Sequence, residues 1–204
     1  MEYFLEKNPT IKHHDEIKKW LNLEYKQFGE GFIVNWNVIL NAFERNEFMV
    51  FLKDGKSIGF VTFREHDSTV DIGLFCIQHQ YRGLGYGRRF MQELEIYLKS
   101  KKIIAVSLFC EPIQSESFWK KAGFYPAPKT GFNDTQLTYW KALIPIKETS
   151  SKHDLLNKIE LWSEEPINTY GNMPKWTWEI TNSNLNILQY AYYDWNLKIT
   201  VNGK

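Results

Sequence analysis

The chain has 204 residues, with 25 Lys and Arg against 24 Asp and Glu and a formal net charge of +1. This length can bury a hydrophobic core without disulfides or a structural metal, and the charge balance argues against nucleic-acid binding, which usually needs a basic face. There is no apolar run of the roughly 18 residues that a membrane span needs and no signal-peptide pattern at Met1–Lys7, so we expect a cytoplasmic protein without nucleic-acid or membrane partners.

Helices and strands are predicted to alternate along most of the chain. The pair Asp54-Gly55 predicts a tight turn between two strands, because Gly adopts positive φ without strain. The alternation indicates an α/β or α+β fold with a mixed sheet. In chain order, the apolar patterns predict a strand over 3–5, helices over 14–28 and 35–44, strands over 47–52, 58–63 and 70–77, a helix over 84–102 and a strand over 103–110.

The composition changes near residue 145. All Phe and Arg residues lie before this point, whereas Trp, Tyr and Asn are frequent after it. We therefore predict a main domain over 1–145 and an aromatic-rich carboxy-terminal extension over 146–204. Its aromatic side chains are expected to pack on the main domain or a partner subunit; the alternative is stacking on a sugar or a base. The extension is predicted to hold a short helix over 155–163 and strands over 175–180, 185–193 and 195–201.

The stretch from Ile77 to Arg89 carries the clearest chemical signal, since it follows a predicted strand and opens a predicted helix. Its three glycines alternate, at Gly83, Gly85 and Gly87. Three of the chain's five arginines flank it, namely Arg82, Arg88 and Arg89. Such glycines let backbone N–H groups converge on an anion, and the helix dipole adds positive charge there. We predict a phosphate site, most simply for pyrophosphate; the alternative is a glycine-rich turn with basic residues on a solvated helix face.

The glycine spacing excludes two common nucleotide-binding motifs. The third glycine comes too early for Gly-x-Gly-x-x-Gly, and no Gly-Lys-Ser or Gly-Lys-Thr occurs. Residues 80–85, Gln-Tyr-Arg-Gly-Leu-Gly, instead match the pattern Gln/Arg-x-x-Gly-x-Gly/Ala. Residues 115–124 match a second pattern, Ala-x-x-Phe-Tyr-x-Lys-x-Gly-Phe, in part. On these two motifs the sequence resembles the GCN5-related N-acetyltransferase (GNAT) superfamily, well over 45–145 and loosely over 1–44.

The resemblance implies a GNAT-like fold, a mixed and mostly antiparallel central sheet with helices on both faces. It implies an enzyme that transfers an acetyl group from acetyl-coenzyme A to a primary amine by direct attack in a ternary complex. The alternative is a non-catalytic acyl-coenzyme A-binding or interaction module with the same fold. The sequence does not distinguish a small-molecule amine from a peptide amine as acceptor, and it leaves a homodimer open. We expect the extension to close one side of the acceptor groove.

The resemblance also implies the cofactor contacts. The pyrophosphate would lie on the backbone N–H groups of residues 82–87, with the side chains of Gln80, Arg82 and Arg88 beside it. The preceding strand would face the pantetheine arm, and a backbone amide at Phe75 or its neighbour would stabilise the oxyanion of the tetrahedral intermediate. The cofactor-binding residues implied are Phe75, Cys76, Ile77, Gln80, Arg82, Gly83, Leu84, Gly85, Tyr86, Gly87, Arg88, Ser115 and Trp119.

Three residues depart from the family pattern. Trp119 stands where many members have a Tyr that protonates the leaving thiolate, and an indole N–H cannot act as an acid. Tyr125 and Tyr86 are candidates for this role, although an alkyl thiol with a pKa of about 8.5 can also leave as the thiolate. Pro112 replaces an Asn that often contacts the cofactor, and His79 replaces a common Pro.

A base is also needed, because the amine is protonated at neutral pH. Asp71 lies on the strand before the turn, at a position where the family frequently carries a carboxylate or a histidine. Strand alternation predicts that it shares a face with Gly73 and Phe75. The alternative for Asp71 is a solvated carboxylate at a strand end, and Glu111 is a second choice for the base.

The remaining histidines and cysteines do not indicate further chemistry. His13 and His14 are adjacent on a predicted helix and cannot face one metal, so we expect both on the surface, and no residue set has zinc spacing. Cys76 and Cys110 are predicted to be buried, inert thiols, and two such cysteines do not make a disulfide framework.

Overall fold

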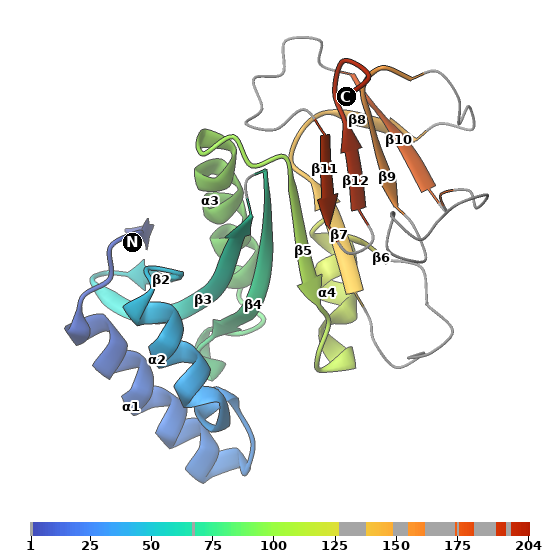
Figure 1. Cartoon of the computed structure of the whole chain (residues 1–204). Helices are drawn as coiled ribbons and strands as arrows, with labels where there is room; N and C mark the ends of the chain where they lie inside the picture. Colours follow the sequence, from blue (N-terminus) through green and yellow to red (C-terminus); the bar gives the residue numbers. More distant parts are fainter. Residues whose placement is uncertain are drawn as a thin grey trace. The chain divides into compact units, whose positions relative to one another are not determined.

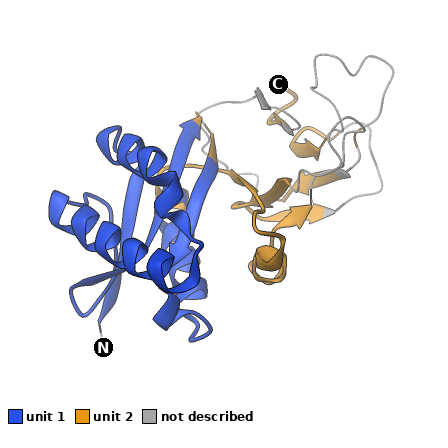
Figure 2. Cartoon of the chain, turned by 90° about the horizontal axis from the view of Figure 1, so that it is seen from below, with its two compact units in different colours: residues 1–65, 71–98 blue, residues 66–70, 99–204 orange. Residues whose placement is uncertain are grey.

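The computed structural model describes residues 2–66, 68–126, 138–148, 155–161, 174, 176–181, 191–194 and 197–204. The chain forms two compact units (Figure 2). Unit 1 comprises residues 1–65 and 71–98, and unit 2 comprises residues 66–70 and 99–204. The predicted boundary near residue 145 lies between two strands of unit 2 and stays a prediction.

Unit 1 is built on neighbouring strands covered by helices. The strand order is β1-β2-β3-β4, and the pairs β1–β2 and β2–β3 are antiparallel. Helices α1 and α2 cover one face of these strands and α3 covers the other (Figure 1). The elements are β1 (Tyr3–Glu6), α1 (Ile11–Phe28), η1 (Phe32–Asn35), α2 (Trp36–Glu44), β2 (Phe48–Lys53), β3 (Lys56–His66), β4 (Thr69–Ile77), η2 (His79–Tyr81) and α3 (Tyr86–Ser100).

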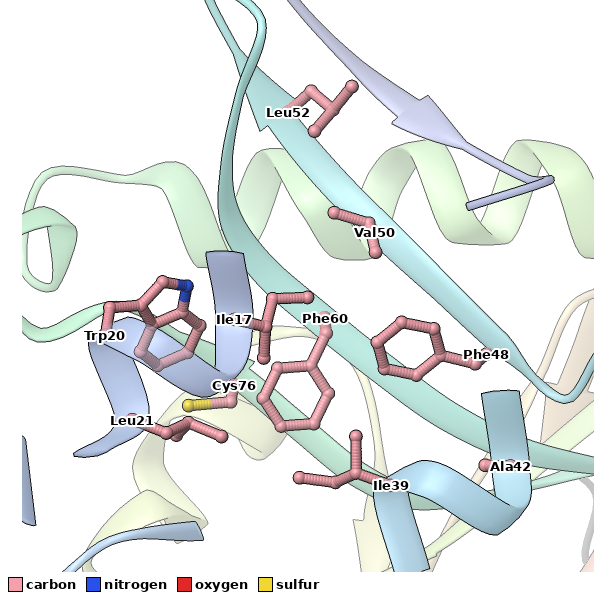
Figure 3. Packing of buried hydrophobic residues seen from close by; sticks show 10 residues of the cluster. All are labelled: Ile17, Trp20, Leu21, Ile39, Ala42, Phe48, Val50, Leu52, Phe60 and Cys76. Carbon is pink, nitrogen blue, oxygen red and sulfur yellow. The ribbon is translucent and has the colours of Figure 1, made fainter. Parts of the chain in front are cut away.

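Strand β2 of unit 1 is buried on both faces. Val50 belongs with Ile17 and Ile39 to a buried cluster beneath α1 and α2 (Figure 3). The next residue, Phe51, stacks on Phe90 of α3 with 5.0 Å between the ring centroids. Because successive strand residues point to opposite faces, a helix layer on each side explains the continuous apolar run in β2.

The predicted turn at Asp54-Gly55 is confirmed. The two residues have φ angles of 47° and 76°, and they join the paired residues Lys53 and Lys56 of β2 and β3. Two central residues with positive φ are what a two-residue type I′ hairpin requires. The hairpin therefore follows directly from the local sequence.

Unit 2 contains a short helix and strands of two sheets. The order β5-β7-β6 is antiparallel, and a second antiparallel sheet has the order β11-β12-β9-β10-β8. Trp140 of β7 and Trp178 of β10 belong to one buried cluster. The elements are β5 (Ala105–Phe109), η3 (Ile113–Ser115), α4 (Glu116–Lys121), β6 (Tyr125–Pro126), β7 (Thr138–Ala142), β8 (Ile146–Glu148), β9 (Lys158–Leu161), β10 (Trp176–Ile180), β11 (Ala191–Asp194) and β12 (Leu197–Thr200).

The predicted helix over 155–163 is wrong, because residues 158–161 form strand β9. Ile159 and Leu161 both belong to the buried cluster of Trp140 and Trp178, which is the two-residue period of a strand. Lys158 and Glu160, the alternate residues of the strand, form an ion pair at 3.0 Å. Most of the predicted strand over 185–193 lies outside the described residues.

The predicted fold class is confirmed, since the chain forms a mixed α/β structure with mostly antiparallel strands. In the described parts of the chain, no helix is long and apolar enough to cross a membrane. Across the same residues, no group of His, Cys, Asp and Glu is arranged to hold a metal ion. Cys76 and Cys110 are free and buried, as predicted.

The predicted surface position of His14 is wrong. The residue is only 5% exposed, and its ring lies 4.4 Å from Trp36 and 5.1 Å from Phe43, centroid to centroid. Burial lowers the pKa of His14, outweighing the opposite effect of the adjacent Asp15 carboxylate. The neutral ring of His14 on α1 thus packs against the aromatic rings of α2.

We expect His14 to make folding stability depend on pH. Its folded pKa lies below the unfolded value of about 6.5, so the unfolded chain binds the proton more readily. The stability is fully present above the unfolded pKa and is lost as the pH falls towards the folded pKa. His14→Phe should reduce the pH dependence of the free energy of unfolding, measured by urea denaturation between about pH 5 and about pH 8. An unchanged slope of this dependence in His14→Phe would contradict the assignment.

Candidate functional site

The turn after β4 is held open by glycine conformation. The chain leaves β4 through η2 and enters α3 at Tyr86. Gly83 and Gly85 have φ angles of +75° and +84°, a region that L side chains rarely adopt. A Cβ atom added at either glycine would meet no other atom within 4 Å. The space in front of both glycines is therefore open.

The N–H groups of residues 83–88 are available to a ligand. On one side, Arg82 donates its N–H to the His79 carbonyl at 3.0 Å; on the other, Arg89 donates to the Gly85 carbonyl at 3.2 Å. Among the described residues, no hydrogen-bond acceptor is found for the N–H groups in between. Unsatisfied N–H groups at the start of a helix form an anion site. The Arg82 N–H is already used by η2, and the predicted contact of this amide with the pyrophosphate stays a prediction.

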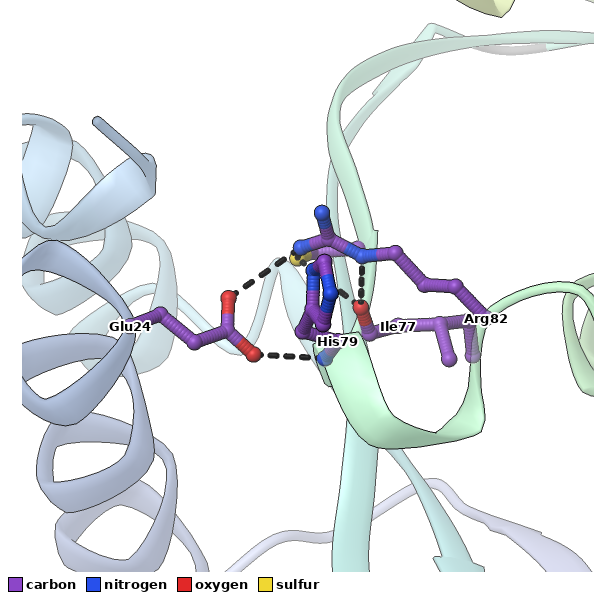
Figure 4. A network of polar contacts seen from close by, with 5 residues as sticks. Glu24, Ile77, His79 and Arg82 are labelled. Carbon is purple, nitrogen blue, oxygen red and sulfur yellow. Dashed lines mark hydrogen bonds and ion pairs between the residues drawn. The ribbon is translucent and has the colours of Figure 1, made fainter. Parts of the chain in front are cut away.

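The arginines around the turn have different roles. The Arg82 guanidinium forms an ion pair with Glu24, with 3.1 Å between Nη2 and Oε2 (Figure 4). The Arg89 guanidinium lies 4.7 Å from the ring centroid of Tyr3. Arg88 is exposed, and no described residue pairs with its side chain. The Arg82 side chain is engaged with Glu24, and its predicted position beside the pyrophosphate stays a prediction, as do those of Arg88 and the exposed Gln80.

The sequence reasoning missed Glu24, a buried carboxylate of α1. Its Oε1 accepts the backbone N–H of His79 at 2.6 Å, and its Oε2 accepts Arg82 Nη2 at 3.1 Å. Arg82 Nε in turn donates to the carbonyl of Ile77 at 2.7 Å (Figure 4). The carboxylate thus ties α1 to both ends of η2. The sequence did contain a sign of this role. Glu24 follows Ile17 and Leu21 at helical spacing, so it lies on the buried face of α1, where a charged side chain needs a partner.

The side chains at the end of β4 point into the protein. Phe75 stacks on Phe90 of α3 at 4.6 Å, and Cys76 and Ile77 are buried. Burial raises the pKa of the Cys76 thiol to about 12, so this thiol is neutral and unreactive. Only backbone atoms of Cys76 and Ile77 remain to face a pantetheine arm, and that contact stays a prediction.

The predicted shared face holds for Asp71 and Gly73, which line one hollow, and is wrong for Phe75. A Cβ added to Gly73 would lie 2.8 Å from Oγ1 of Thr62, and Thr62 pairs with Phe48 on the side of α1 and α2. Phe75 faces α3 instead. The alternation is interrupted because Leu74 donates its N–H to Thr62 Oγ1, at 2.8 Å, as at a β-bulge. The backbone N–H of Leu74, a neighbour of Phe75, is therefore already bonded to Thr62, unlike the N–H that an oxyanion would need.

Asp71 and Gly73 line a hollow of about 330 Å³ within unit 1. Its wall comes from α2, β3 and β4 and includes Arg45, Glu47, Thr62 and Arg64 as well. This volume is at the lower end of the roughly 300–1,000 Å³ of small-molecule sites. The first half of β4 therefore contributes a carboxylate to the hollow, and its end leads into the open turn at Gly83 and Gly85.

The predicted cofactor residues of unit 2 bond to each other. Trp119 is 6% exposed, and its Nε1 donates to Ser115 Oγ at 3.2 Å. Ser115 Oγ donates to the carbonyl of Pro112 at 2.8 Å. These contacts favour a packing role for Trp119, and a cofactor contact by either residue stays a prediction. The proposed acids, Tyr86 at the start of α3 and Tyr125 on β6, also stay predictions.

Comparisons with known proteins address the family and the fold. A model of the Acetyltransferase (GNAT) family matches residues 15–124, which include both motifs. The fold is similar to PaiA N-acetyltransferase from Thermoplasma acidophilum in complex with coenzyme A, at 18% identity and a TM-score of 0.56 over 70% of this chain and 99% of that one. It is also similar to GCN5 from Tetrahymena, at 18% identity and a TM-score of 0.54 over 71% and 98% of the two chains.

A third similar structure is N-acetylglutamate synthase from Neisseria gonorrhoeae, complexed with coenzyme A and N-acetyl-glutamate. It shares 11% identity with a TM-score of 0.54 over 71% of this chain and 36% of that one. At these identities the solved structures show the fold alone. No curated protein matches the chain in sequence.

Proposed function

Because the chain belongs to the GNAT acetyltransferase family, we propose that it transfers the acetyl group of acetyl-coenzyme A to a primary amine by direct attack in a ternary complex. The observation that carries this proposal is the open turn, whose N–H groups at residues 83–88 have no acceptor among the described residues. An amide cradle of this kind at a helix start suits a pyrophosphate. Coenzyme A contains one.

The turn fits the coenzyme in shape and charge. Gly83 and Gly85 present no side chain to the open space in front of them, so a phosphate can approach the backbone closely. The start of α3 adds the positive end of a helix dipole, and the exposed Arg88 adds a cation beside it. When bound, the coenzyme supplies the activated acetyl thioester.

Asp71 is the base in this proposal. It lies on the wall of the hollow, where an incoming ammonium group would meet its carboxylate and lose a proton before attack. A backbone N–H near Phe75, other than the engaged one of Leu74, would donate to the thioester oxygen as negative charge develops there. Trp119 cannot protonate the leaving thiolate.

The test measures free thiol release from acetyl-coenzyme A by the full chain with a panel of amines. Thiol release that depends on an amine supports the proposal. The burial of Trp119 in place of an acidic Tyr favours, as a second candidate, a non-catalytic acyl-coenzyme A-binding module. Tight coenzyme binding without turnover on any amine would favour that module and refute the enzyme.

Glu24→Gln should weaken coenzyme A binding although Glu24 does not touch the ligand. Glutamine keeps an oxygen for the His79 N–H but loses the charge that holds Arg82. Hydrogen bonds to charged groups contribute about 1.5–3 kcal/mol, so we expect roughly a tenfold or greater loss of affinity by calorimetry.

The matched control for Glu24→Gln is Glu16→Gln on the same helix. The Glu16 carboxylate accepts the N–H and Oγ of Ser57 at 3.1 and 2.6 Å, away from the turn. Its variant should bind coenzyme A like the wild type. Equal affinity of wild type and Glu24→Gln would show that the turn does not depend on the carboxylate.

A further inference from the structure

The hollow beside Asp71 carries both signs of charge on its wall. Arg45 follows α2 and Arg64 lies on β3, whereas Glu47 precedes β2 and Asp71 lies on β4. All five arginines of the chain lie either at the turn or on this wall, and none of the 20 lysines lines the hollow in the described part of the chain.

The two arginines of the hollow have no partner in the described part of the chain. Both are exposed, and neither guanidinium forms an ion pair or hydrogen bond with a described residue. Arginine presents a planar fork of N–H donors that matches a carboxylate in two parallel hydrogen bonds, which lysine cannot do. Two unpaired guanidiniums on the wall of a small hollow are thus suited to an acid group of a ligand.

We propose that the acceptor is a small amine that also carries a carboxylate, an amino acid or a close relative of one. Arg45 and Arg64 hold its carboxylate, and Asp71 receives its amino group. This inference rests on the proposed acetyl transfer and narrows its acceptor. A zwitterion matches a wall with two cations and two anions, whereas a polyamine or an aminoglycoside would bring only positive charge to the two arginines. The volume of about 330 Å³ suits a small ligand.

The experiment compares each of the common amino acids with its carboxamide as acceptor for thiol release by the full chain. The amide keeps the amine and the side chain but removes the negative charge. We expect at least one amino acid to have a KM that is about tenfold or more below that of its amide, as loss of a charged hydrogen-bond pair implies.

Substitutions of the two arginines then test whether they bind the carboxylate of the acceptor. Arg45→Met and Arg64→Met should each raise the KM for that amino acid about tenfold and leave the KM for its amide within about twofold. Lys19→Met, which removes one positive charge from the exposed side of α1, should leave both KM values unchanged. The inference is overturned if amides or polyamines are acetylated as well as the amino acids, or if neither arginine variant changes the KM for the acid.

Failure of the inference and failure of the proposed function give different results. Turnover confined to amines without a carboxylate overturns the inference and leaves acetyl transfer standing. If no amine releases thiol although coenzyme A binds, the enzyme proposal fails. The acceptor assignment then fails with it, and calorimetric titration of the same amino acids into the coenzyme-bound protein tests the binding site alone: binding that the arginine variants lose supports recognition of a carboxylate by Arg45 and Arg64, and the absence of binding overturns it.

Discussion

Replacing Gly85 by Val should abolish coenzyme A binding and leave the protein folded. Gly85 has a φ of +84°, which a β-branched residue adopts only with strain of about 1–3 kcal/mol. The turn would relax by rotating its N–H groups away from their common target, and the valine side chain would occupy the open space in front of the turn. We expect calorimetry to show an affinity loss of about a hundredfold or more, which corresponds to roughly 2.7 kcal/mol.

Gly29→Val is the matched control. Gly29 ends α1 with a φ of +74°, and an added Cβ there also meets nothing within 4 Å. The two variants therefore share the strain of a positive φ, but only Gly85 lies in the turn itself. Gly29→Val should lose stability and keep its affinity for the coenzyme. Wild-type affinity in both Gly83→Val and Gly85→Val would refute the cofactor site.

Asp71→Asn should lower kcat by about 10²–10⁴-fold, the range for loss of a general base, with unchanged affinity for coenzyme A. Asparagine keeps the shape of the side chain but cannot take a proton from the amine. The remaining activity should rise at high pH, where more of the amine is already deprotonated. Steady-state kinetics across pH measure both effects.

Glu47→Gln is the control for Asp71→Asn, because Glu47 lies on the wall of the same hollow. It removes the same charge from the hollow without removing the proposed base, so its kcat should stay within about threefold of the wild-type value. A kcat for Asp71→Asn that is equally close to the wild-type value would exclude Asp71 as the base.

Local features of the fold could be predicted from the sequence. The turn at Asp54-Gly55 and the open turn at Gly83 and Gly85 follow from the preference of glycine and a few polar residues for positive φ. The helices and strands of unit 1 follow from apolar periodicity, which is also local. The glycines, the flanking arginines and the predicted helix start indicated a phosphate ligand at the second turn, and the family resemblance then identified it as the pyrophosphate of acetyl-coenzyme A.

Contacts between distant residues could not be predicted in this way. The partners His79 and Arg82 of Glu24 are 55 and 58 residues away in sequence. Three arginines near the turn therefore looked equivalent, although Arg82 and Arg89 are engaged within the protein. A buried position for Glu24 on the stripe of α1 could be predicted, but the identity of its partners depends on tertiary structure.

The face of Asp71 relative to that of Phe75 was mispredicted, because strand alternation was extended through an irregular strand. A single irregular residue moves every side chain before it to the opposite face of the sheet. In β4 the cause is the side chain of Thr62, which takes the N–H of Leu74. This interruption places Gly73 on the side of α1 and α2, whereas Phe75 faces α3. No local pattern in the sequence of β4 predicts the interruption.

The most direct test is a crystal structure of the protein with coenzyme A. The account predicts pyrophosphate oxygens about 2.7–3.2 Å from backbone nitrogens of residues 83–88, the range of N–H···O hydrogen bonds, with the Glu24–Arg82 ion pair intact behind the turn. A pyrophosphate bound elsewhere, or N–H groups of residues 83–88 bonded to the protein's own carbonyls in that complex, would contradict it.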